Sequence, residues 1–242
     1  PAAGQMVGDV KYLPYCTNAE CTEFSQAKLS MTPATINATT CGPQYVDVMV
    51  TDVADLTAYT MIVNFDQTKV RIDNVAIQGT FFANNTQHDV ISMLEDPGND
   101  TGKMIFTAHM QDKTPDGNPG PVTGSGTLIR ITYTPLLGTT TFTVDAESLL
   151  VGWPEANPMP FSVSGAATAT LTGGVVRNTS TSVNYCSLAT AVADAGAAHK
   201  LQLLTDLTIP AMIPVDKALT LDLNGKVATA STGINALNVT TG

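Results

Sequence analysis

Apolar and polar residues alternate along two neighbouring stretches, and this alternation constrains the fold more than any other feature of the sequence. Three valines share one face of the segment 45–51, and the same spacing recurs in the segment 59–65. A period of two residues is typical of a strand that buries one face. The turn-like run 52–55 lies between the stretches. The pattern predicts two strands joined by a turn.

Similar short apolar segments continue along the chain, separated by clusters of Pro, Gly, Asp and Asn such as 96–100 and 112–121. Further strands are expected at 69–78, 89–94, 103–109, 126–134, 139–144, 147–151 and 160–172. Thr accounts for 36 of the 242 residues, which favours strands over helices. About nine short strands without intervening helices predict an all-β fold, with an antiparallel sandwich of jelly-roll type over residues 28–175. Residues 1–27 show no sustained period and are expected to form an extended N-terminal segment.

The pattern changes after residue 174. Apolar residues at helical spacing, closed by Gly196, predict one short helix over 187–195. Three short apolar strands are expected near 200–209, 217–223 and 234–240. Their roughly regular spacing is typical of solenoid coils, which bury their core only by stacking. We therefore expect a small module of β-helix-like coils with one short helix over 183–242.

Charge and hydropathy exclude several classes of function. The chain has 11 Lys and Arg against 21 Asp and Glu, a net charge of −10. Nucleic acids and anionic membrane surfaces both require a basic face, so neither is expected as a partner. No run of 18 apolar residues is present, which argues against a membrane-spanning helix. The first residues lack the features of a signal peptide, so we expect a mature secreted protein.

Four cysteines, at positions 16, 21, 41 and 186, form an even set without the C-x-x-C spacing of zinc sites. Two disulfides in an oxidising, extracellular compartment are expected, with three connectivities open. We favour a local Cys16–Cys21 bridge and a Cys41–Cys186 bridge between the sandwich and the coils. The glycosylation candidates are the five sequons that begin at Asn37, Asn84, Asn99, Asn178 and Asn238.

Three segments carry a family resemblance. Residues 45–66 and 69–73 are similar to the run "v-x-d-L-x-g-f-x-f-x-l-x-y-D" and the following "k-L-e-v" strand of cohesins. Residues 124–133 resemble the cohesin strand "G-x-G-x-L-x-x-I-x-F". Residues 28–174 thus resemble a cohesin-type β-sandwich of bacterial and archaeal surface proteins. The resemblance implies recognition of a dockerin-like partner, or of a polysaccharide, without marking the binding residues.

A second resemblance concerns residues 183–242. The segments 187–192, 203–209 and 219–226 are similar to the opening coils of right-handed parallel β-helices in secreted adhesins and polysaccharide-active enzymes. The short entry helix resembles the helix that caps the first coil in such proteins. This resemblance implies an adhesin, or the N-terminal part of a β-helix carbohydrate-active enzyme.

No arrangement of residues predicts catalysis, and we expect a protein that is not an enzyme. The histidines, His88, His109 and His199, are far apart in the sequence and are not expected to form a ligand set. The carboxylates that could line a β-helix face are Asp206, Asp216 and Asp222, and the last is expected to point outward near a turn. The single Trp153 is expected to pack at a corner rather than to stack on a sugar.

No cofactor is expected, and calcium is the one metal for which the sequence offers ligands. The oxygen-rich loops contain Asp112, Asp116 and Asn118, together with Asp96, Asn99 and Asp100. They lack EF-hand spacing, and turn formation explains the same residues.

The N-terminal segment offers a route to assembly. Met6, Val10, Tyr12 and Leu13 form an imperfect strand, which would pair with the open sheet edge of a neighbouring subunit. The leading hypothesis is therefore a secreted structural or adhesive subunit of a filament, sheath or surface layer, which associates with itself through sheet edges. The alternatives are a cohesin-type recognition module that binds a dockerin-like partner or a polysaccharide, and the N-terminal part of a β-helix carbohydrate-active enzyme. Other surface proteins are further candidate partners.

Overall fold

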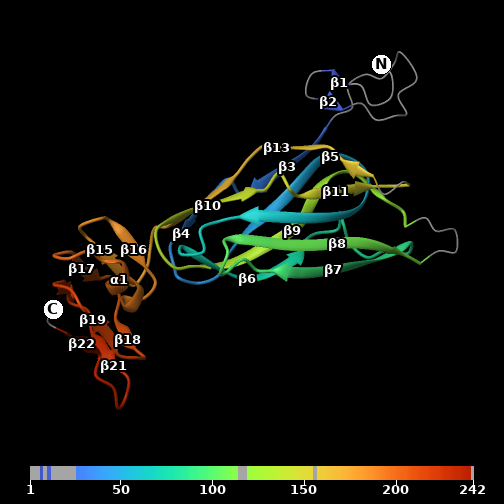
Figure 1. Ribbon diagram of the computed structural model, residues 1–242. Helices are drawn as coiled ribbons and strands as arrows, with labels where there is room; N and C mark the ends of the chain where they lie inside the picture. The colour runs from blue at the N-terminus through green and yellow to red at the C-terminus, as the bar shows by residue number, and fades with distance from the viewer. Residues whose placement is uncertain (1–5, 8–9, 12–25, 114–118, 155–156, 241–242) are drawn as a thin grey trace.

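A computed structural model describes Met6–Val7, Val10–Lys11 and residues 26–113, 119–154 and 157–240. The described residues are all-β apart from one short helix, as predicted. A β-sandwich makes up most of the structure, and a smaller C-terminal module, orange to red in Figure 1, is attached to one end of it.

The longest strand of the sandwich, β5 (Gln44–Asn64), corrects the prediction of two strands joined by a turn. Asp52 and Asp55 adopt positive φ angles of 57° and 53°, and the pairing of β5 with its neighbour shifts register on both sides of Val53. Asp tolerates this backbone region better than most residues. The two aspartates therefore bend β5 without ending it, and the halves of one strand serve both layers of the sandwich.

Each layer of the sandwich contains one half of β5. The first layer adds β3 (Ala27–Thr32), β6 (Val70–Ile77), β9 (Val122–Pro135) and β13 (Phe161–Val163). The second adds β7 (His88–Asp96), β8 (Lys103–Asp112), β11 (Leu149–Gly152), β12 (Pro158–Met159) and part of β10 (Thr139–Val144). The order in the second layer is β7, β8, β5 and then β11, with antiparallel pairing throughout.

The first and last strands of the sandwich correct the expectation of a purely antiparallel fold. The predicted strand 160–172 is two strands, β13 and β14 (Ala167–Leu171), separated at Ser164–Ala166. These pair in parallel with β3 and β4 (Thr35–Ala38) respectively. Pro33, which has no N–H to donate, lies between β3 and β4. The N-terminal segment of the sandwich therefore forms β3 and β4, the C-terminal segment forms β13 and β14, and each strand of one segment pairs with one strand of the other.

The core lies between the layers, and the predicted alternation decides which residues enter it. The three valines of the first half of β5 are fully buried, as are Met61 and Val63 of its second half. Aromatic rings fill the centre: the Tyr59 ring lies 4.9 Å from that of Phe82, and the Tyr133 ring lies 4.9 Å from that of Phe142.

Removing the hydroxyl group is expected to change the free energy of unfolding differently at two buried tyrosines. Tyr59 donates to the Leu128 carbonyl oxygen at 3.1 Å, whereas the Tyr133 hydroxyl has no hydrogen-bond partner among the described residues. Tyr133→Phe is therefore expected to leave the free energy of unfolding unchanged or to raise it by about 1 kcal/mol, and Tyr59→Phe to lower it by about 1–3 kcal/mol. Urea unfolding of the two variants measures both values. Equal losses in the two variants would contradict this account of the core.

The C-terminal module begins with a hairpin and the predicted helix. The hairpin consists of β15 (Val176–Asn178) and β16 (Val183–Tyr185), and the helix α1 spans Leu188–Asp194. The Ser187 hydroxyl caps the helix by accepting a hydrogen bond from the Thr190 N–H at 3.0 Å. No helix among the described residues is long and apolar enough to cross a membrane.

Six short strands follow α1, where three longer ones were expected. They are β17 (Lys200–Leu203), β18 (Leu207–Ile209), β19 (Ile213–Val215), β20 (Thr220–Asp222), β21 (Ala228–Ala230) and β22 (Leu237–Val239). Pairing is parallel, β17 with β20, β18 with β21 and β19 with β22. Pro210 and the turn residues around Asp206 and Asn224 interrupt the apolar stretches. Strands β17, β18 and β19 therefore form a first passage of the chain, and β20, β21 and β22 form a second passage in which each strand lies beside its counterpart in the first.

The sandwich and the C-terminal module are joined by hydrogen bonds and a disulfide. Leu137 forms a β-bridge with Tyr185, and the Cys186 N–H donates to the Leu136 carbonyl oxygen at 2.9 Å. The predicted Cys41–Cys186 disulfide is present. The other expected pair, at positions 16 and 21, lies outside the described residues.

Candidate functional site

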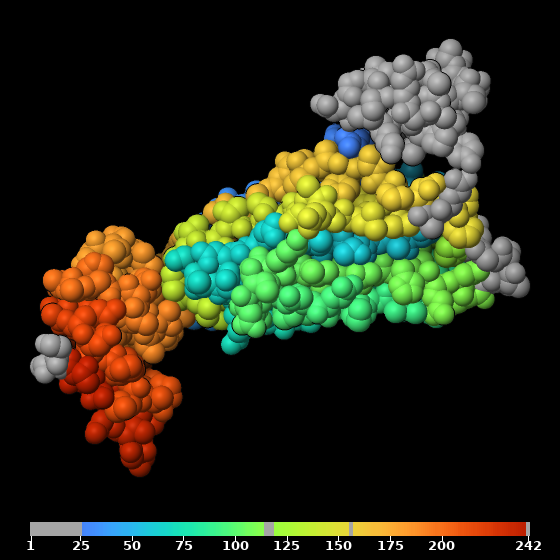
Figure 2. Space-filling model, in the orientation of Figure 1, coloured from blue at the N-terminus to red at the C-terminus, as the bar shows by residue number. Residues whose placement is uncertain are grey.

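The outward surface of the second layer carries the candidate site. It is formed by the side chains of β7, β8, the second half of β5 and β11 that point away from the core, and we call it the site face. Its members are Ile91, Met93, Glu95, Lys103, Ile105, Thr107, His109, Ala58, Thr60, Ile62, Asn64, Leu149 and Val151. Figure 2 shows the strands that bear it as adjoining green, cyan and yellow bands.

Strand register places these side chains in rows across the sheet. One row runs Met93, Thr107, Thr60 and Leu149, because each residue pairs directly with the next. Met93 is 60% exposed and Leu149 is 38% exposed. In the neighbouring row, Ile91, which is 44% exposed, pairs with His109. The centre of the site face is thus a flat surface of aliphatic side chains and threonines.

Hydrogen bonds fix the polar groups in the centre of the site face. The Thr107 hydroxyl donates to the Glu95 carboxylate at 2.6 Å and lies 3.2 Å from the Thr60 hydroxyl oxygen. Because Thr107 donates its hydrogen to Glu95, Thr60 is the donor to Thr107. The strands of Thr107 and Thr60 are paired on both sides, so a ligand would meet side chains here, whereas β7 pairs with β8 alone among the described residues.

Charged residues lie at both ends of the site face, where Lys103 begins β8 and where Lys113, just after β8, pairs with Asp89 at 2.6 Å. Lys103 Nζ lies 2.7 Å from a carboxylate oxygen of Glu147 and 3.8 Å from one of Asp145. Hydrogen bonds from the Glu147 N–H and the Asn64 amide, together with Lys103, hold the pKa of Asp145 below its usual value. An apolar centre with a charged rim is the usual anatomy of a protein–protein interface.

The outward surface of the first layer differs from the site face. Arg130 makes a two-pronged contact with the Asp47 carboxylate, at 2.8 and 2.9 Å, and its guanidinium lies 3.9 Å from the centre of the Tyr45 ring. Arg71 pairs with Asp73 at 2.8 Å. Its charges are matched within the molecule, as they are at Lys103 on the site face. The two surfaces differ in their exposed large apolar residues, which are Tyr45 and Val163 on the first layer and the aliphatic Ile91, Met93 and Leu149 on the site face.

The three histidines lie apart and have separate environments. His88 is fully buried, and its ring nitrogens face the carbonyl oxygens of Pro119 and Ala83. His109 lies on the site face, and the His199 ring lies 3.0 Å from the Asn178 amide. Within the described part of the chain, no three His, Cys, Asp or Glu side chains gather closely enough to hold a metal ion.

The candidate calcium ligands form hydrogen bonds to the backbone, end a strand or lie outside the described residues. The Asp96 carboxylate accepts from the Gly98 N–H at 2.7 Å, and the Asn99 amide both donates to and accepts from the backbone of Ile72. Asp112 is the last residue of β8. The other two residues of that loop, at positions 116 and 118, are outside the described residues. Because most of the loop after β8 lies outside the described residues, the calcium prediction remains untested.

The C-terminal carboxylates are engaged in contacts within the module. Asp222 pairs with Lys200 at 2.9 Å, and this contact, with the Asn224 N–H, lowers the pKa of Asp222. The Asp206 carboxylate accepts from the Val227 N–H at 2.8 Å. Asp216 lies between β19 and β20. At the other end of the molecule, Trp153 follows β11 and is 38% exposed, so it is not enclosed in a packed corner.

The sequons fall into two groups. Asn37, Asn84 and Asn238 are exposed, whereas Asn99 is partly buried and Asn178 is 1% exposed. The Asn178 side chain accepts from the Ser180 N–H in addition to its contact with His199. We therefore keep the first three as glycosylation candidates and assign structural roles to the other two.

The assembly residues were expected to form one strand, and the structure corrects this. Residues Met6–Val7 form β1 and pair antiparallel with Val10–Lys11, which form β2. The segment thus turns back on itself instead of extending as one strand. Tyr12 and Leu13 are outside the described residues, and pairing with a neighbouring subunit remains a prediction.

No protein-family model matches this sequence, and no curated protein matches it. Solved cohesin structures are similar to this chain. A cohesin of Clostridium acetobutylicum shares 19% identity with a TM-score of 0.46, over 61% of this chain and 91% of its own. The sixth cohesin of scaffoldin B from Acetivibrio cellulolyticus, solved in complex with a dockerin, shares 12% identity with a TM-score of 0.46 over 61% of this chain and 99% of its own.

A non-cellulosomal cohesin of the hyperthermophilic archaeon Archaeoglobus fulgidus is also similar. It shares 10% identity with a TM-score of 0.43, over 62% of this chain and 93% of its own. These likenesses to cohesins concern the fold alone.

Sequence reasoning did not find the site face. The cohesin resemblance pointed to strands 45–73 and 124–133 but marked no binding residue. A signal was nevertheless present in β7, where Ile91 and Met93 alternate with Val90 and Leu94. When a strand at the surface of a sandwich has apolar side chains on both faces, its outer face is a candidate binding surface.

Proposed function

We propose that this chain is an extracellular, non-catalytic recognition module that binds a protein partner through the site face. The observation that carries the proposal is the contrast between the two outer surfaces. One leaves Ile91, Met93 and Leu149 exposed in neighbouring rows of one sheet, whereas the large apolar residues exposed on the other are Tyr45, whose ring lies against the Arg130 guanidinium, and Val163. Exposed aliphatic side chains of this kind are costly for an isolated domain and are typical of binding surfaces.

The proposed partner is a dockerin-like module. The resemblance of residues 28–174 to cohesins supports this choice. Exposed side chains spread over four strands suit a folded protein better than a small ligand, which binds in a concave site. The methionine on β7, Met93, is flexible and adapts to different partner side chains. The residues proposed to touch the partner are Met93, Thr107, Thr60 and Leu149.

We further propose two modules and a secreted location. The sandwich would span 28–175, after an N-terminal segment 1–27, and residues 183–242 would form the first coils of a right-handed parallel β-helix. The three parallel strand pairs and the separate hydrophobic cluster beneath α1 support the second module. The Cys41–Cys186 disulfide supports an oxidising compartment.

A structural or adhesive subunit is the second candidate. The observation in its favour is the set of outer edges of β20, β21 and β22, which pair with no other strand among the described residues. Such edges can add strands from another molecule. Self-association through them would build a filament or surface layer.

Calorimetric titration with a panel of purified dockerin modules tests the proposal. We expect a one-to-one complex with at least one dockerin, while the free chain sediments as a monomer. If no dockerin binds and electron micrographs of the chain alone show filaments, the structural subunit becomes the better account.

A further inference from the structure

Glu95 differs from the other charged residues at the site face because it has no cationic partner in the described part of the chain. Lys103 lies 2.7 Å from Glu147, and Lys113 lies 2.6 Å from Asp89. No Lys, Arg or His side chain among the described residues makes an ion pair with Glu95. The Glu95 side chain is exposed. One negative charge of the site face is therefore left unmatched within the molecule.

A β-bulge determines where this carboxylate lies. The pairing of β7 with β8 shifts register between Leu94 and Asp96, so Glu95 is an extra residue with no counterpart on β8. Bulges of this kind change the direction in which a side chain points. The Glu95 carboxylate accepts from the Thr107 hydroxyl at 2.6 Å, and Thr107 belongs to the row that the partner is proposed to touch. A partner that covers this row would therefore also cover Glu95.

The carboxylate is held in position, but only one of its oxygens is used. Thr60 donates to Thr107, and Thr107 donates to Oε1 of Glu95. The strands that carry the two threonines, β5 and β8, are each paired on both sides, so these hydroxyls are fixed in the interior of a sheet. The other oxygen of Glu95, Oε2, accepts from no group in the described part of the chain. It is oriented and available to a donor on another molecule.

Binding would remove water from this carboxylate. A desolvated carboxylate without a counter-ion weakens a complex, whereas one that faces a cation contributes to specificity and speeds association. The surrounding charge also favours a cation. Lys103 is shared by the carboxylates of Asp145 and Glu147, and the chain has a net charge of −10.

We propose that Glu95 selects partners that place a lysine or arginine side chain at the centre of the site face. The inference rests on the proposed function, because it names the chemistry of the partner for the same surface. The cationic group would donate to Oε2 of Glu95, and its aliphatic stem would lie against Met93. Glu95 is thus a specificity-determining residue beside an apolar surface that adapts to different partners.

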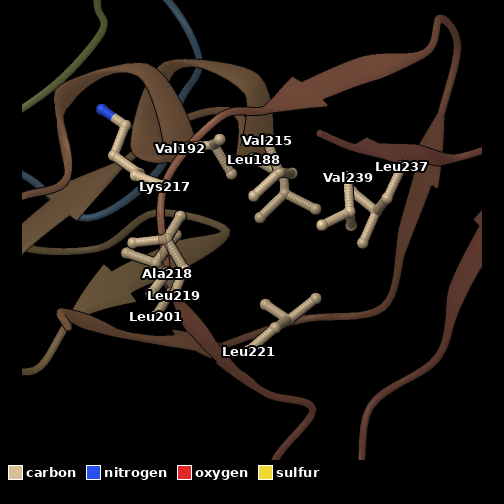
Figure 3. Close-up of a pocket in the computed structure, with 10 residues that line it drawn as sticks. All are labelled: Leu188, Val192, Leu201, Val215, Lys217, Ala218, Leu219, Leu221, Leu237 and Val239. Atoms are coloured by element: carbon tan, nitrogen blue, oxygen red, sulfur yellow. The ribbon is translucent and has the colours of Figure 1, made fainter. Parts of the chain in front are cut away.

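The apolar cavity of the C-terminal module does not offer an alternative site for such a cation. The cavity has a volume of about 220 Å³, and Figure 3 shows the aliphatic side chains that line it. Lys217 contributes the one charged side chain among its lining residues, and its ammonium group donates to the carbonyl oxygens of Ala193 and Ala195 at 3.0 and 2.8 Å. A second cation there would meet no carboxylate and would be repelled by this ammonium group.

Calorimetric titration with a dockerin module that binds the parent chain tests the inference. Glu95→Gln removes the charge but keeps an oxygen that accepts from Thr107. We expect this variant to bind at least about 10-fold more weakly than the parent at low salt, and the difference to shrink between about 0.05 and 0.5 M NaCl. The matched control is Asp216→Asn, which removes one negative charge from an exposed residue of the C-terminal module and is expected to bind like the parent.

Charge reversal identifies the contribution of the partner. Glu95→Lys is expected to bind the unchanged dockerin at least about 100-fold more weakly than the parent chain does. Each lysine and arginine of the dockerin is then replaced in turn by glutamate. One of these replacements should restore binding to Glu95→Lys and weaken binding to the parent, because the two charges are coupled. All variants of the chain are expected to melt at the same temperature, since Glu95 is exposed.

The outcomes separate this inference from the proposed function. Equal affinity of the parent and Glu95→Gln at every salt concentration would overturn the inference alone, as would an equal loss of affinity in Asp216→Asn. The absence of any restoring replacement in the dockerin would overturn it in the same way. Failure of every dockerin to bind the parent chain would overturn the proposed function, and this inference with it.

Discussion

The double variant Cys41→Ser, Cys186→Ser is expected to unfold with a free energy about 5 kcal/mol lower than that of the parent chain. The two cysteines are separated by 145 residues. In the chain-entropy account, closing a loop of this length removes conformations from the unfolded chain and stabilises the folded state by about 5 kcal/mol. We expect the destabilisation to be greatest where the sandwich joins the C-terminal module, because the Cys186 N–H also donates to the Leu136 carbonyl oxygen there.

Urea unfolding of the parent and the double variant measures this effect. We expect one transition in the parent and, in the variant, earlier unfolding of the C-terminal module than of the sandwich. The comparison variant is Cys16→Ser, Cys21→Ser, whose expected loop is so short that the same relation gives a loss of only about 2 kcal/mol. A loss below about 1 kcal/mol in the first variant would contradict the proposed role of the disulfide.

The sequence was sufficient to predict most strands of the sandwich, because alternation directly determines which face of a strand is buried, but β3 and β4 were not predicted. It was insufficient at β5, where a turn was expected at residues 52–55. Asp favours turns and also tolerates positive φ within a bulge. The contacts that decide between the two come from far along the chain: Thr123 and Ser125 accept from the N–H groups of Asp55 and Asp52 at 2.9 and 3.3 Å.

The C-terminal strands show a related limit. The apolar content of the segment 200–209 was recognised, but the break after Leu203 was not, because a three-residue strand is too short to display a period. The site face was missed for another reason. Its residues come from four strands, and only register places Leu149 in the same row as Thr60 and Met93. Local patterns do not contain that information.

The second large effect is expected at the site face. In the double variant Met93→Glu, Leu149→Glu, two carboxylates replace aliphatic side chains on either side of the Thr60 and Thr107 pair. Both residues are exposed, so the free energy of unfolding should change by less than about 0.5 kcal/mol per site. Binding would place both charges in a desolvated interface, and we expect at least a 100-fold weaker complex, about 2.7 kcal/mol.

The matched control is the double variant Val163→Glu, Met212→Glu. These residues are 43% and 52% exposed, and they lie on β13 and after β18, away from the site face. The control introduces the same change in net charge, so an effect of net charge alone would weaken binding in both variants.

Calorimetric titration of a bound dockerin with the parent, the site-face variant and the control variant tests the central claim most directly. We predict that the control binds as tightly as the parent, that the site-face variant binds at least about 100-fold more weakly, and that all three proteins melt at the same temperature. Parent-like affinity in the site-face variant would contradict the claim, because it would show that the partner binds elsewhere on the molecule.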